Sequence, residues 1–433
     1  MRILIIAGQV PYPINSGARL HTYNVLQRVA MKHEVWLTAF IETPEQLLGV
    51  EHLQSFCQRV FTVKAVHSGS LLKPGLALRY LLKGIPPDLR FYYSGEMARI
   101  INDLTSQVNF DVIHIEHSYM GMYLENLPKA LWQNTIWCMH DIDWIKFARI
   151  ASLEPKLTRK MRLWLHSHMM RRWQSRLAEQ FACCTTVTTV DQQLLKEANP
   201  RLEVHVIPVG VDTKRYKLLP NKTDRPAIIF VGNMDYLPNA DAVTYFCSDI
   251  LPLIQCQVPG VEMWIVGIDP LPEVRRLEGS GVHVTGRVDD VRPYYGRSTV
   301  CVTPLRAGSG GRIKIMESMA LGRPVISTSI GCEGLEVVDS KTILIANTNE
   351  EFAEKTVLLL NDQALYNIIK MNARKWVEAY RDYDVIAEQL LHLYQRVAEG
   401  SYQAKELDNT YSSIELNDHL IRKNIATPNE IHK

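Results

Sequence analysis

The sequence predicts an α/β protein of two domains, each built on a parallel β-sheet. At 433 residues the chain is too long for one ordinary hydrophobic core and fits two domains of about 200 residues. An apolar strand followed by a loop and a helix begins at residue 2 and again at residue 227. A strand, a glycine loop, a helix and a second strand follow one another at residues 299–328. This order is typical of parallel sheets.

The first domain is predicted at residues 1–207. It opens with the short buried strand "RILIIAG", after which a loop with Pro and Gly leads into a helix and a second strand, "HEVWLTAF". The segment at residues 205–226 is irregular and rich in Pro and charged residues, which is the composition of a linker. The two halves are therefore expected to join near residue 210.

The second domain is predicted at residues 208–375. Its expected strands include "AIIFVG", "VEMWIVG", "VHVTGRV", "TVCVTPL" and "PVIST", all short and apolar. Helices are expected at residues 376–400. Residues 401–433 are polar with little periodic apolar pattern, so we expect a mobile tail.

Composition excludes several classes of protein. No apolar run reaches the roughly 18 residues of a membrane span, and the start of the chain lacks the pattern of a signal peptide. The eight cysteines show no paired metal-type spacing, which suits a reducing cytoplasm better than a disulfide scaffold. A net charge of +2 gives no indication of nucleic-acid binding. We expect a cytoplasmic protein without a nucleic-acid partner.

The stretch "RAGSGGRIKIMESMALGRPVIST" at residues 306–328 carries the strongest chemical signal. If its helix begins near Gly311, Arg312 and Lys314 lie in the first turn, where cations are unfavourable by roughly 0.3–1 kcal/mol each. An anion at that helix end would relieve the conflict. The pattern therefore favours a phosphate site, with merely solvated side chains as the alternative.

Four stretches resemble the family 4 glycosyltransferases of the GT-B fold: "IPVGVD", "FVGNMDYLPNADAV", "VTGRVDDVRPYY" and "PLRAGSGGRIKIMESMALGRPVISTSIGCEGL". The likeness is closest to the bacterial branch that builds exopolysaccharides and surface glycans. "PYPINSGARLHTYNVL", "FDVIHIEHSYMGMYL" and "HDIDW" are consistent with it, so the resemblance covers most of residues 1–395. It implies two facing Rossmann-like domains, with an acceptor in the first, a nucleotide-sugar in the second, and a C-terminal helix crossing back to the first.

The resemblance assigns the donor contacts to the second domain. Glu317 would accept hydrogen bonds from the ribose hydroxyls, while Arg312 and Lys314 would neutralise the diphosphate. The glycine loop would bring backbone amides to the phosphate or the sugar through Gly308, Ser309, Gly310 and Gly311. The other donor-binding residues implied are Gly232 and Asn233 near the diphosphate, and Val288 and Asp289 beside the base.

In the first domain the resemblance places Gly17 in a loop facing the donor and His140 against the transferred sugar. Two departures from the family pattern stand out. Many members carry another glutamate in the glycine loop, where this chain has Ser309. The common Arg and Lys after the second domain's first strand are absent from "GNMDYLPN", so Arg306 and Arg312 are expected to supply that charge.

Fixed cations at the diphosphate would stabilise the charge that grows on the leaving group in the transition state. We therefore expect a metal-independent enzyme without a cofactor. The resemblance implies a nucleotide-sugar substrate, such as a UDP- or GDP-sugar. The resemblance implies hexosyl transfer to a glycan or lipid-linked acceptor with retention, the departing phosphate accepting the acceptor's proton. A sugar-nucleotide epimerase of similar fold and a non-catalytic sugar-nucleotide-binding subunit stay open as alternatives.

Two short motifs also permit a metal site. Asp141 and Asp143 form the Asp-x-Asp pattern that holds a metal in the single-domain GT-A transferases. In "IHIEHSY", His114, Glu116 and His117 have metal-ligating side chains, but the flanking apolar residues favour a strand that ends near the cleft.

Residues 156–177 hold seven Lys and Arg and no acidic residue. Leu157, Met161, Trp164 and Leu165 share one helical face, whereas the apolar side rotates after residue 169. One straight interfacial helix does not explain both halves. Peripheral contact with the inner face of the membrane and ordinary packing with a solvated basic face are both open.

Overall fold

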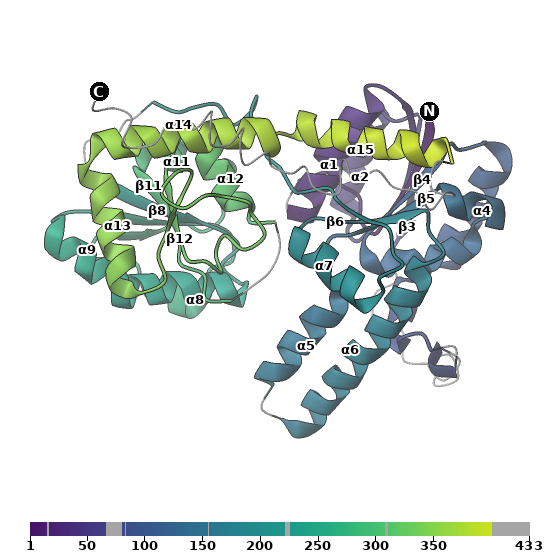
Figure 1. Ribbon diagram of the computed structural model, residues 1–433, viewed down its shortest axis with the longest axis horizontal. Helices are drawn as coiled ribbons and strands as arrows, with labels where there is room; N and C mark the ends of the chain where they lie inside the picture. The colour runs from purple at the N-terminus through teal and green to yellow at the C-terminus, as the bar shows by residue number, and fades with distance from the viewer. Residues whose placement is uncertain are drawn as a thin grey trace. The chain divides into compact units, whose positions relative to one another are not determined.

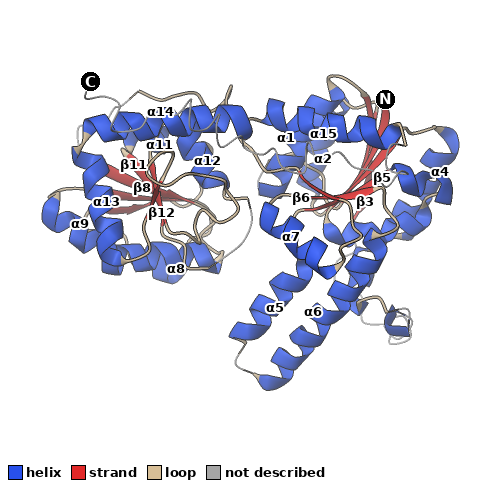
Figure 2. Cartoon of the chain, in the orientation of Figure 1, coloured by secondary structure: helices blue, strands red, loops and turns tan. Residues whose placement is uncertain are grey.

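The computed structural model describes residues 1–14, 17–65, 80–82, 84–154, 156–220, 226–307 and 311–400, without the side chains of residues 149, 152 and 153. Within this part of the chain, Met1–Pro208 and the segment from Ile386 form one compact unit, and Val209–Val385 form the second (Figure 1). Each unit is a sheet flanked by helices, drawn red and blue in Figure 2. The tail expected at residues 401–433 lies outside the described residues.

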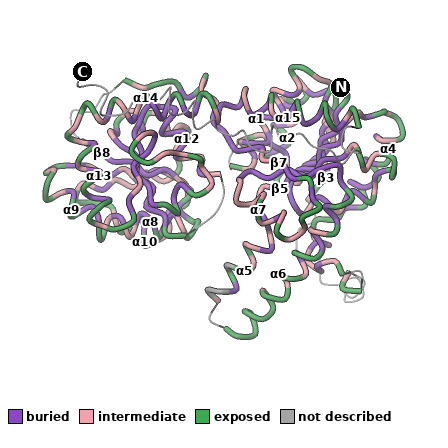
Figure 3. Tube along the Cα trace, in the orientation of Figure 1, coloured by how far each residue is buried: buried purple, intermediate pink, exposed green. Residues whose placement is uncertain are grey.

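The described part of the first unit contains a seven-stranded parallel sheet in the order β3-β2-β1-β4-β5-β6-β7. Its central strands are buried (Figure 3), because helices cover both faces, and this burial explains their continuous apolar runs. The strands are β1 (Arg2–Ala7), β2 (Glu34–Ile41), β3 (Arg59–Lys64), β4 (Val112–Glu116), β5 (Thr135–Met139), β6 (Cys183–Thr186) and β7 (Val204–Val206).

Helix α15 (Tyr383–Ala398) begins in the second unit and enters the first at Ile386, whereas α14 (Gln363–Tyr380) stays in the second. The other helices in the described part of the first unit are α1 (Gly17–Ala30), α2 (Leu47–Gln54), α4 (Gly95–Gln107), α5 (Asp143–Leu153), α6 (Leu157–Ala178) and α7 (Thr189–Ala198). Short 3₁₀ helices are η1 (Pro44–Gln46), η2 (Pro87–Tyr92), η3 (Ser118–Asn126) and η4 (Lys129–Asn134).

The second unit, as far as it is described, holds a six-stranded parallel sheet in the order β10-β9-β8-β11-β12-β13. The strands are β8 (Ala227–Val231), β9 (Glu262–Val266), β10 (Val282–Val284), β11 (Val300–Thr303), β12 (Val325–Ser327) and β13 (Leu344–Ile345). The helices besides α14 are α8 (Leu237–Tyr245), the π-helix η5 (Phe246–Ile250), α9 (Leu251–Gln257), α10 (Pro272–Arg275), α11 (Arg292–Arg297), α12 (Ile313–Ala320) and α13 (Asn349–Asn361).

Each sheet has one point at which the strand order reverses. It lies between β1 and β4 in the first unit and between β8 and β11 in the second. The helices that follow the two strands of such a pair pack on opposite faces of the sheet, which leaves a crevice at the carboxyl ends of the strands where ligands bind. The topology therefore directs attention to the residues that follow these four strands.

The helix expected to begin near Gly311 begins instead at Ile313, and Arg312 precedes it. Arg312 has φ 50° and ψ 37°, which is left-handed backbone and cannot continue a right-handed helix. The expectation that Arg312 lies in the first helical turn is therefore wrong. Lys314, the second helical residue, does lie there.

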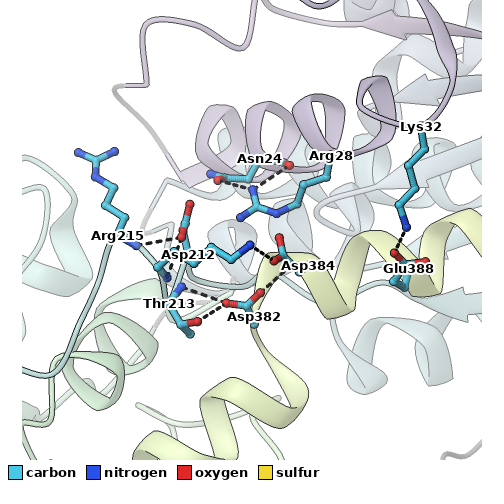
Figure 4. Close-up of polar contacts among 10 residues, drawn as sticks. Asn24, Arg28, Lys32, Asp212, Thr213, Arg215, Asp382, Asp384 and Glu388 are labelled. Carbon is cyan, nitrogen blue, oxygen red and sulfur yellow. Dashed lines mark hydrogen bonds and ion pairs between the residues drawn. The ribbon is translucent and has the colours of Figure 1, made fainter.

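On the second unit's side, the two segments by which the chain enters and leaves that unit are tied together. Val211 donates its backbone N–H to the Arg381 carbonyl over 2.8 Å. The Asp382 carboxylate accepts the Thr213 N–H over 3.0 Å and the Asp384 N–H over 2.7 Å, the latter as a helix cap at the start of α15 (Figure 4). These bonds fix where α15 begins.

Candidate active site

In the second unit, Gly232 and Lys314 meet at the carboxyl edge where β8 and β11 lie side by side. Gly232 directly follows β8, and Lys314 comes from the first turn of α12 after β11. A Cβ at Gly232 would lie 2.8 Å from Asn239 Nδ2 and 3.0 Å from Lys314 Nζ. A larger residue at this position would displace the Asn239 amide or the Lys314 amine.

Neutral groups hold the Lys314 amine. It donates to Asn239 Oδ1 over 2.6 Å, and its Nζ lies 4.0 Å from the centre of the Phe230 ring. Burial, with a contribution from the nearby Arg312 charge, lowers the pKa of Lys314 from 10.5 to about 7, although Cys301 and Glu317 oppose the fall. An anion bound here would favour the charged amine and raise that pKa again. The electrostatics thus suit a phosphate.

Glu317 lies one turn after Lys314 on α12 and is only 9% exposed. Its Oε1 accepts a hydrogen bond from the Tyr216 hydroxyl over 2.8 Å. Burial raises the pKa of Glu317 to about 7, although the Tyr216 hydrogen bond and the Arg215 charge oppose the rise. The carboxylate therefore changes its charge near neutral pH.

The two arginines of the glycine loop have different surroundings. Arg312 is buried, and its Nη2 donates to the Ile330 carbonyl over 2.7 Å. Arg306 forms an ion pair with Asp241 of α8, with 3.0 Å between Nε and Oδ2, and its guanidinium lies 4.4 Å from the centre of the Tyr245 ring. The charge of Arg306 is thus already matched by a carboxylate in this structure.

Other expected donor residues are placed as follows. Gly311 packs against Val209, because a Cβ there would lie 2.7 Å from its side chain. Asn233 Oδ1 accepts the Asp235 N–H over 3.3 Å, and its carbonyl accepts from Asn239 Nδ2 over 2.8 Å. The remaining loop residues, Gly308, Ser309 and Gly310, lie outside the described residues.

A pocket of about 560 Å³ lies beside the segment expected to border the base. Arg215, Asp290 and Arg292 contribute to its lining, and Arg292 forms an ion pair with Asp290 over 2.8 Å. Val288 is half-buried and Asp289 is exposed; the pocket lining as described includes neither. The charges of Arg215 and Asp290 act on Glu317, which links this pocket to the carboxylate.

In the first unit, a cluster of imidazoles surrounds one buried carboxylate at the β1/β4 edge. Glu116 ends β4, and its Oε2 lies 2.5 Å from Nε2 of His140, the residue after β5. The His117 ring stacks on His140 with 4.7 Å between centres, and the His21 ring meets it edge-on at 5.4 Å. His140, the expected sugar contact, is therefore held in place from several sides.

The imidazoles of the cluster differ in their pKa values. Burial lowers the pKa of His21 to about 3 and that of His117 to about 4, with the charge of His140 adding to both shifts. Burial opposes charge on His140 too, but the neighbouring Cys138 and Glu116 raise its pKa well above the ordinary value. Protonation at this edge is therefore favoured on His140, and on His114, whose pKa the Glu116 charge raises despite burial.

The same cluster contains the atoms that a metal site needs. Among the described residues, donor atoms of His114, Glu116 and Cys138 lie within 4.8 Å of one another, as do those of Glu116, His117 and His140. The contacts present are carboxylate–imidazole pairs, since Glu116 binds His140 directly. His114 also bonds through Nδ1 to the α15 residue Tyr394, over 2.6 Å. The strand end expected at "IHIEHSY" is found, because β4 ends at Glu116.

The Asp-x-Asp motif does not form a paired site here. Asp143 begins α5 and accepts hydrogen bonds from the Ser118 hydroxyl and, over 3.4 Å, from Gln174 Nε2, whereas Asp141 is exposed. Gly17, expected in a loop facing the donor, is the first residue of α1.

Comparison with known proteins connects this geometry to a family. Residues 16–215 match the model described as "Glycosyltransferase Family 4", and residues 225–362 match the one described as "Glycosyl transferases group 1". A Klebsiella pneumoniae protein, named only as an uncharacterized 44.6 kDa protein in the cps region, is 19% identical over 391 residues, covering 88% of this chain and 96% of the relative. A phosphatidyl-myo-inositol mannosyltransferase from Propionibacterium freudenreichii is 22% identical over 377 residues, covering 79% and 90%.

Solved structures share the fold. The sucrose-phosphate synthase of Thermosynechococcus elongatus superposes with a TM-score of 0.64 at 17% identity, over 92% of this chain and 99% of that one. Anabaena HepE, in complex with UDP and glucose, superposes with a TM-score of 0.63 at 17% identity, over 91% and 99%.

The fold and the two family models together define a glycosyltransferase with the two-domain GT-B architecture. The chain belongs to the family 4 glycosyltransferases, which confirms the resemblance seen in its sequence. The single-domain GT-A alternative, which rested on Asp141 and Asp143, is thereby excluded.

Sequence reasoning missed several residues that complete the site. Asn239 binds the Lys314 amine, Asp241 pairs with Arg306, and Tyr216 binds Glu317. Asn239 and Asp241 lie within a quoted motif, so their position was a usable signal. Tyr216 lies in the linker, where nothing in the local pattern marks it.

We predict that Glu317→Gln gains stability over the wild type as pH rises. With a folded pKa of about 7 and an unfolded pKa of about 4.3, the folded wild type binds more protons in between, so its stability falls as pH rises through that range. Gln does not titrate and can still accept from Tyr216. Denaturant unfolding at about pH 5 and about pH 8 should show the variant gaining about 2–3 kcal/mol relative to the wild type. A variant whose free energy of unfolding, relative to the wild type, is lower at about pH 8 than at about pH 5 would contradict the raised pKa of Glu317.

Proposed function

We propose that the protein transfers a hexose from a UDP- or GDP-sugar to a glycan or lipid-linked acceptor. One observation carries this proposal: a buried amine with neutral hydrogen-bonding and ring partners lies against Gly232 at the strand-order reversal. A nucleoside diphosphate would bring a negatively charged group to this amine. The reversal of strand order is also the place where ligands bind in such sheets. HepE, a protein of the same fold, was solved with UDP and glucose, which supports a donor of this type.

In this proposal Lys314 and Arg312 bind the diphosphate, and Glu317 accepts hydrogen bonds from the ribose hydroxyls. The glycosidic bond between the sugar and the phosphate breaks, and the electron pair stays with the diphosphate oxygen. A cation fixed beside that oxygen stabilises the transition state more than the ground state, because the negative charge grows as the bond breaks. Bound donor would also restore the charge of Lys314.

The first unit would supply the contact to the transferred sugar. Cys138 and Glu116 raise the pKa of His140 well above its ordinary value, which favours an imidazolium that can donate to a sugar hydroxyl or a phosphate oxygen. The reaction proposed is retaining, with the departing phosphate taking the proton of the attacking acceptor hydroxyl. An epimerase is not favoured, because the first-unit carboxylates Glu116 and Asp143 are both engaged by neighbouring side chains. A non-catalytic subunit is not favoured either, because both halves of the chain match glycosyltransferase families.

Lys314→Met is expected to lower turnover by about ten- to a hundredfold, which corresponds to the loss of one charge-assisted hydrogen bond of about 1.5–3 kcal/mol. Thermal stability should hold or rise, because a buried amine is replaced by an apolar side chain. Nucleoside diphosphate release from a panel of nucleotide-sugars and acceptors measures the rate, and calorimetry the melting temperature.

The matched control is Lys375→Met, which removes an exposed lysine of α14 in the same unit and should leave the rate unchanged. Normal turnover in Lys314→Met would contradict the proposed role. Arg312→Ala is a poorer test, because it also removes the hydrogen bond to Ile330 and should reduce stability.

Transferase activity should survive treatment with EDTA. Lys314 and Arg312 are proposed to take the place of a divalent ion at the diphosphate, and Glu116 is proposed to bind His140 rather than a metal. The measurement compares initial rates before and after chelation and after dialysis. Complete loss that Mn²⁺, Mg²⁺ or Zn²⁺ restores would overturn the metal-independent mechanism.

A further inference from the structure

The outer half of α6 presents four large apolar side chains to solvent. Leu157 is 69% exposed, Met161 63%, Trp164 57% and Leu165 55%. Their spacing of four, seven and eight residues puts them on one stripe of the helix. We call this stripe, with its four side chains, the outer stripe of α6. Apolar side chains this exposed at regular helical spacing indicate a face that meets another apolar phase.

The outer stripe is on the opposite side of α6 from the face that packs. Met170, Trp173 and Leu177 are buried in the core of the first unit, and the Ser167 hydroxyl donates to the Trp144 carbonyl over 2.8 Å. At 100° per residue these positions lie about half a turn from the outer stripe. The two apolar faces predicted from the sequence thus have separate roles. The face with Met170, Trp173 and Leu177 packs in the core, and the outer stripe does not.

Basic side chains flank the outer stripe. Residues 156–177 contain seven Lys and Arg and no acidic residue. Lys160 and Arg162 are exposed on either side of the stripe, and Arg171 and Arg172 are exposed along its continuation toward the core. Figure 1 shows α5 and α6 side by side, extending away from the sheet of their unit, and Figure 3 shows exposed positions along the outer part of α6. The stripe is therefore accessible within its unit.

We propose that the outer stripe of α6 docks on an anionic lipid bilayer. Leu157, Met161 and Leu165 would enter the interface, Trp164 would lie at headgroup depth, and the flanking lysine and arginines would bind lipid phosphates. Charge decides the partner, because a second copy of this helix would bring its basic side chains against identical ones. A negatively charged surface with an apolar interior matches both components of the stripe.

This surface extends the proposed function, since a lipid-linked acceptor would lie in the same bilayer. The binding itself does not depend on the reaction. Vesicle binding without nucleotide-sugar turnover would leave the docking proposal standing and remove the transferase mechanism. Turnover of a soluble acceptor without vesicle binding would do the reverse.

The test is co-sedimentation with vesicles of phosphatidylcholine alone or with about one third phosphatidylglycerol. The wild type should bind the anionic vesicles, and raising salt from about 0.1 to about 0.5 M should weaken the binding. Replacing Leu157, Met161, Trp164 and Leu165 together by Gln, a good helix former, should weaken it at least about tenfold. A control variant with Met31→Gln and Leu48→Gln, which are 73% and 77% exposed elsewhere in the first unit, should bind like the wild type.

Helical circular dichroism and the melting temperature show whether the fourfold variant is folded, and Trp164→Gln alone provides a milder second test. Replacing Lys160, Arg162, Arg171 and Arg172 by Gln should remove the preference for anionic lipid. The proposal is overturned if the stripe variant binds as well as the wild type, or if neutral and anionic vesicles bind equally. It is also overturned if the wild type forms a concentration-dependent dimer that the stripe variant abolishes.

Discussion

The candidate site depends on the burial of one lysine amine, that of Lys314, at the start of α12. Among the described residues, Lys314 contacts an amide oxygen and an aromatic face, and burial lowers its pKa to about 7. The surrounding elements serve this placement: Gly232 leaves the space, and the left-handed backbone of Arg312 lets α12 begin where it does. A core that only had to be stable would gain by an apolar side chain here.

Glu317 is buried in the same way, but because it is an acid its pKa is raised where that of Lys314 is lowered. Its pKa is raised to about 7 by burial, so the unliganded site holds an amine and a carboxylate that are both costly to charge near neutral pH. Functional sites commonly reduce the stability of the fold in this way, by burying charged groups whose partner is the ligand. A donor with a diphosphate and a ribose would meet both groups one helical turn apart.

The sequence predicted much of this arrangement because its signals are local. Glycine and the apolar pattern predicted the order of β11, loop, α12 and β12, and charge spacing singled out Lys314 and Glu317. The partners of these side chains come from distant segments, as Asn239 and Tyr216 show, and no local pattern encodes such contacts. For the same reason the sequence left Arg306 free to bind a phosphate, whereas folding brings Asp241 against it.

Helix α6 shows the other limit of sequence reasoning. Its two apolar faces are visible in the residue pattern, but only the fold shows that the face with Met170 and Trp173 packs inward. The His140 cluster is a similar case: "IHIEHSY" predicted a strand end, but only the fold brings Glu116 and Cys138 to His140 through the β4–β5 pairing, and Tyr394 of α15 to His114. The sequence thus showed which segments are apolar or can carry charge, but not which residues they contact in the fold.

The most direct test of the central claim is the number of protons taken up when a nucleoside diphosphate binds. Isothermal titration of UDP and GDP at about pH 8, in two buffers of different ionisation enthalpy, measures this number. Lys314 is mostly neutral there, so a diphosphate that binds against it should draw in close to one proton, about 0.5–1 per ligand. Lys314→Met should bind more weakly with no uptake. Binding by the wild type without proton uptake, or no binding of either nucleotide, would contradict the account.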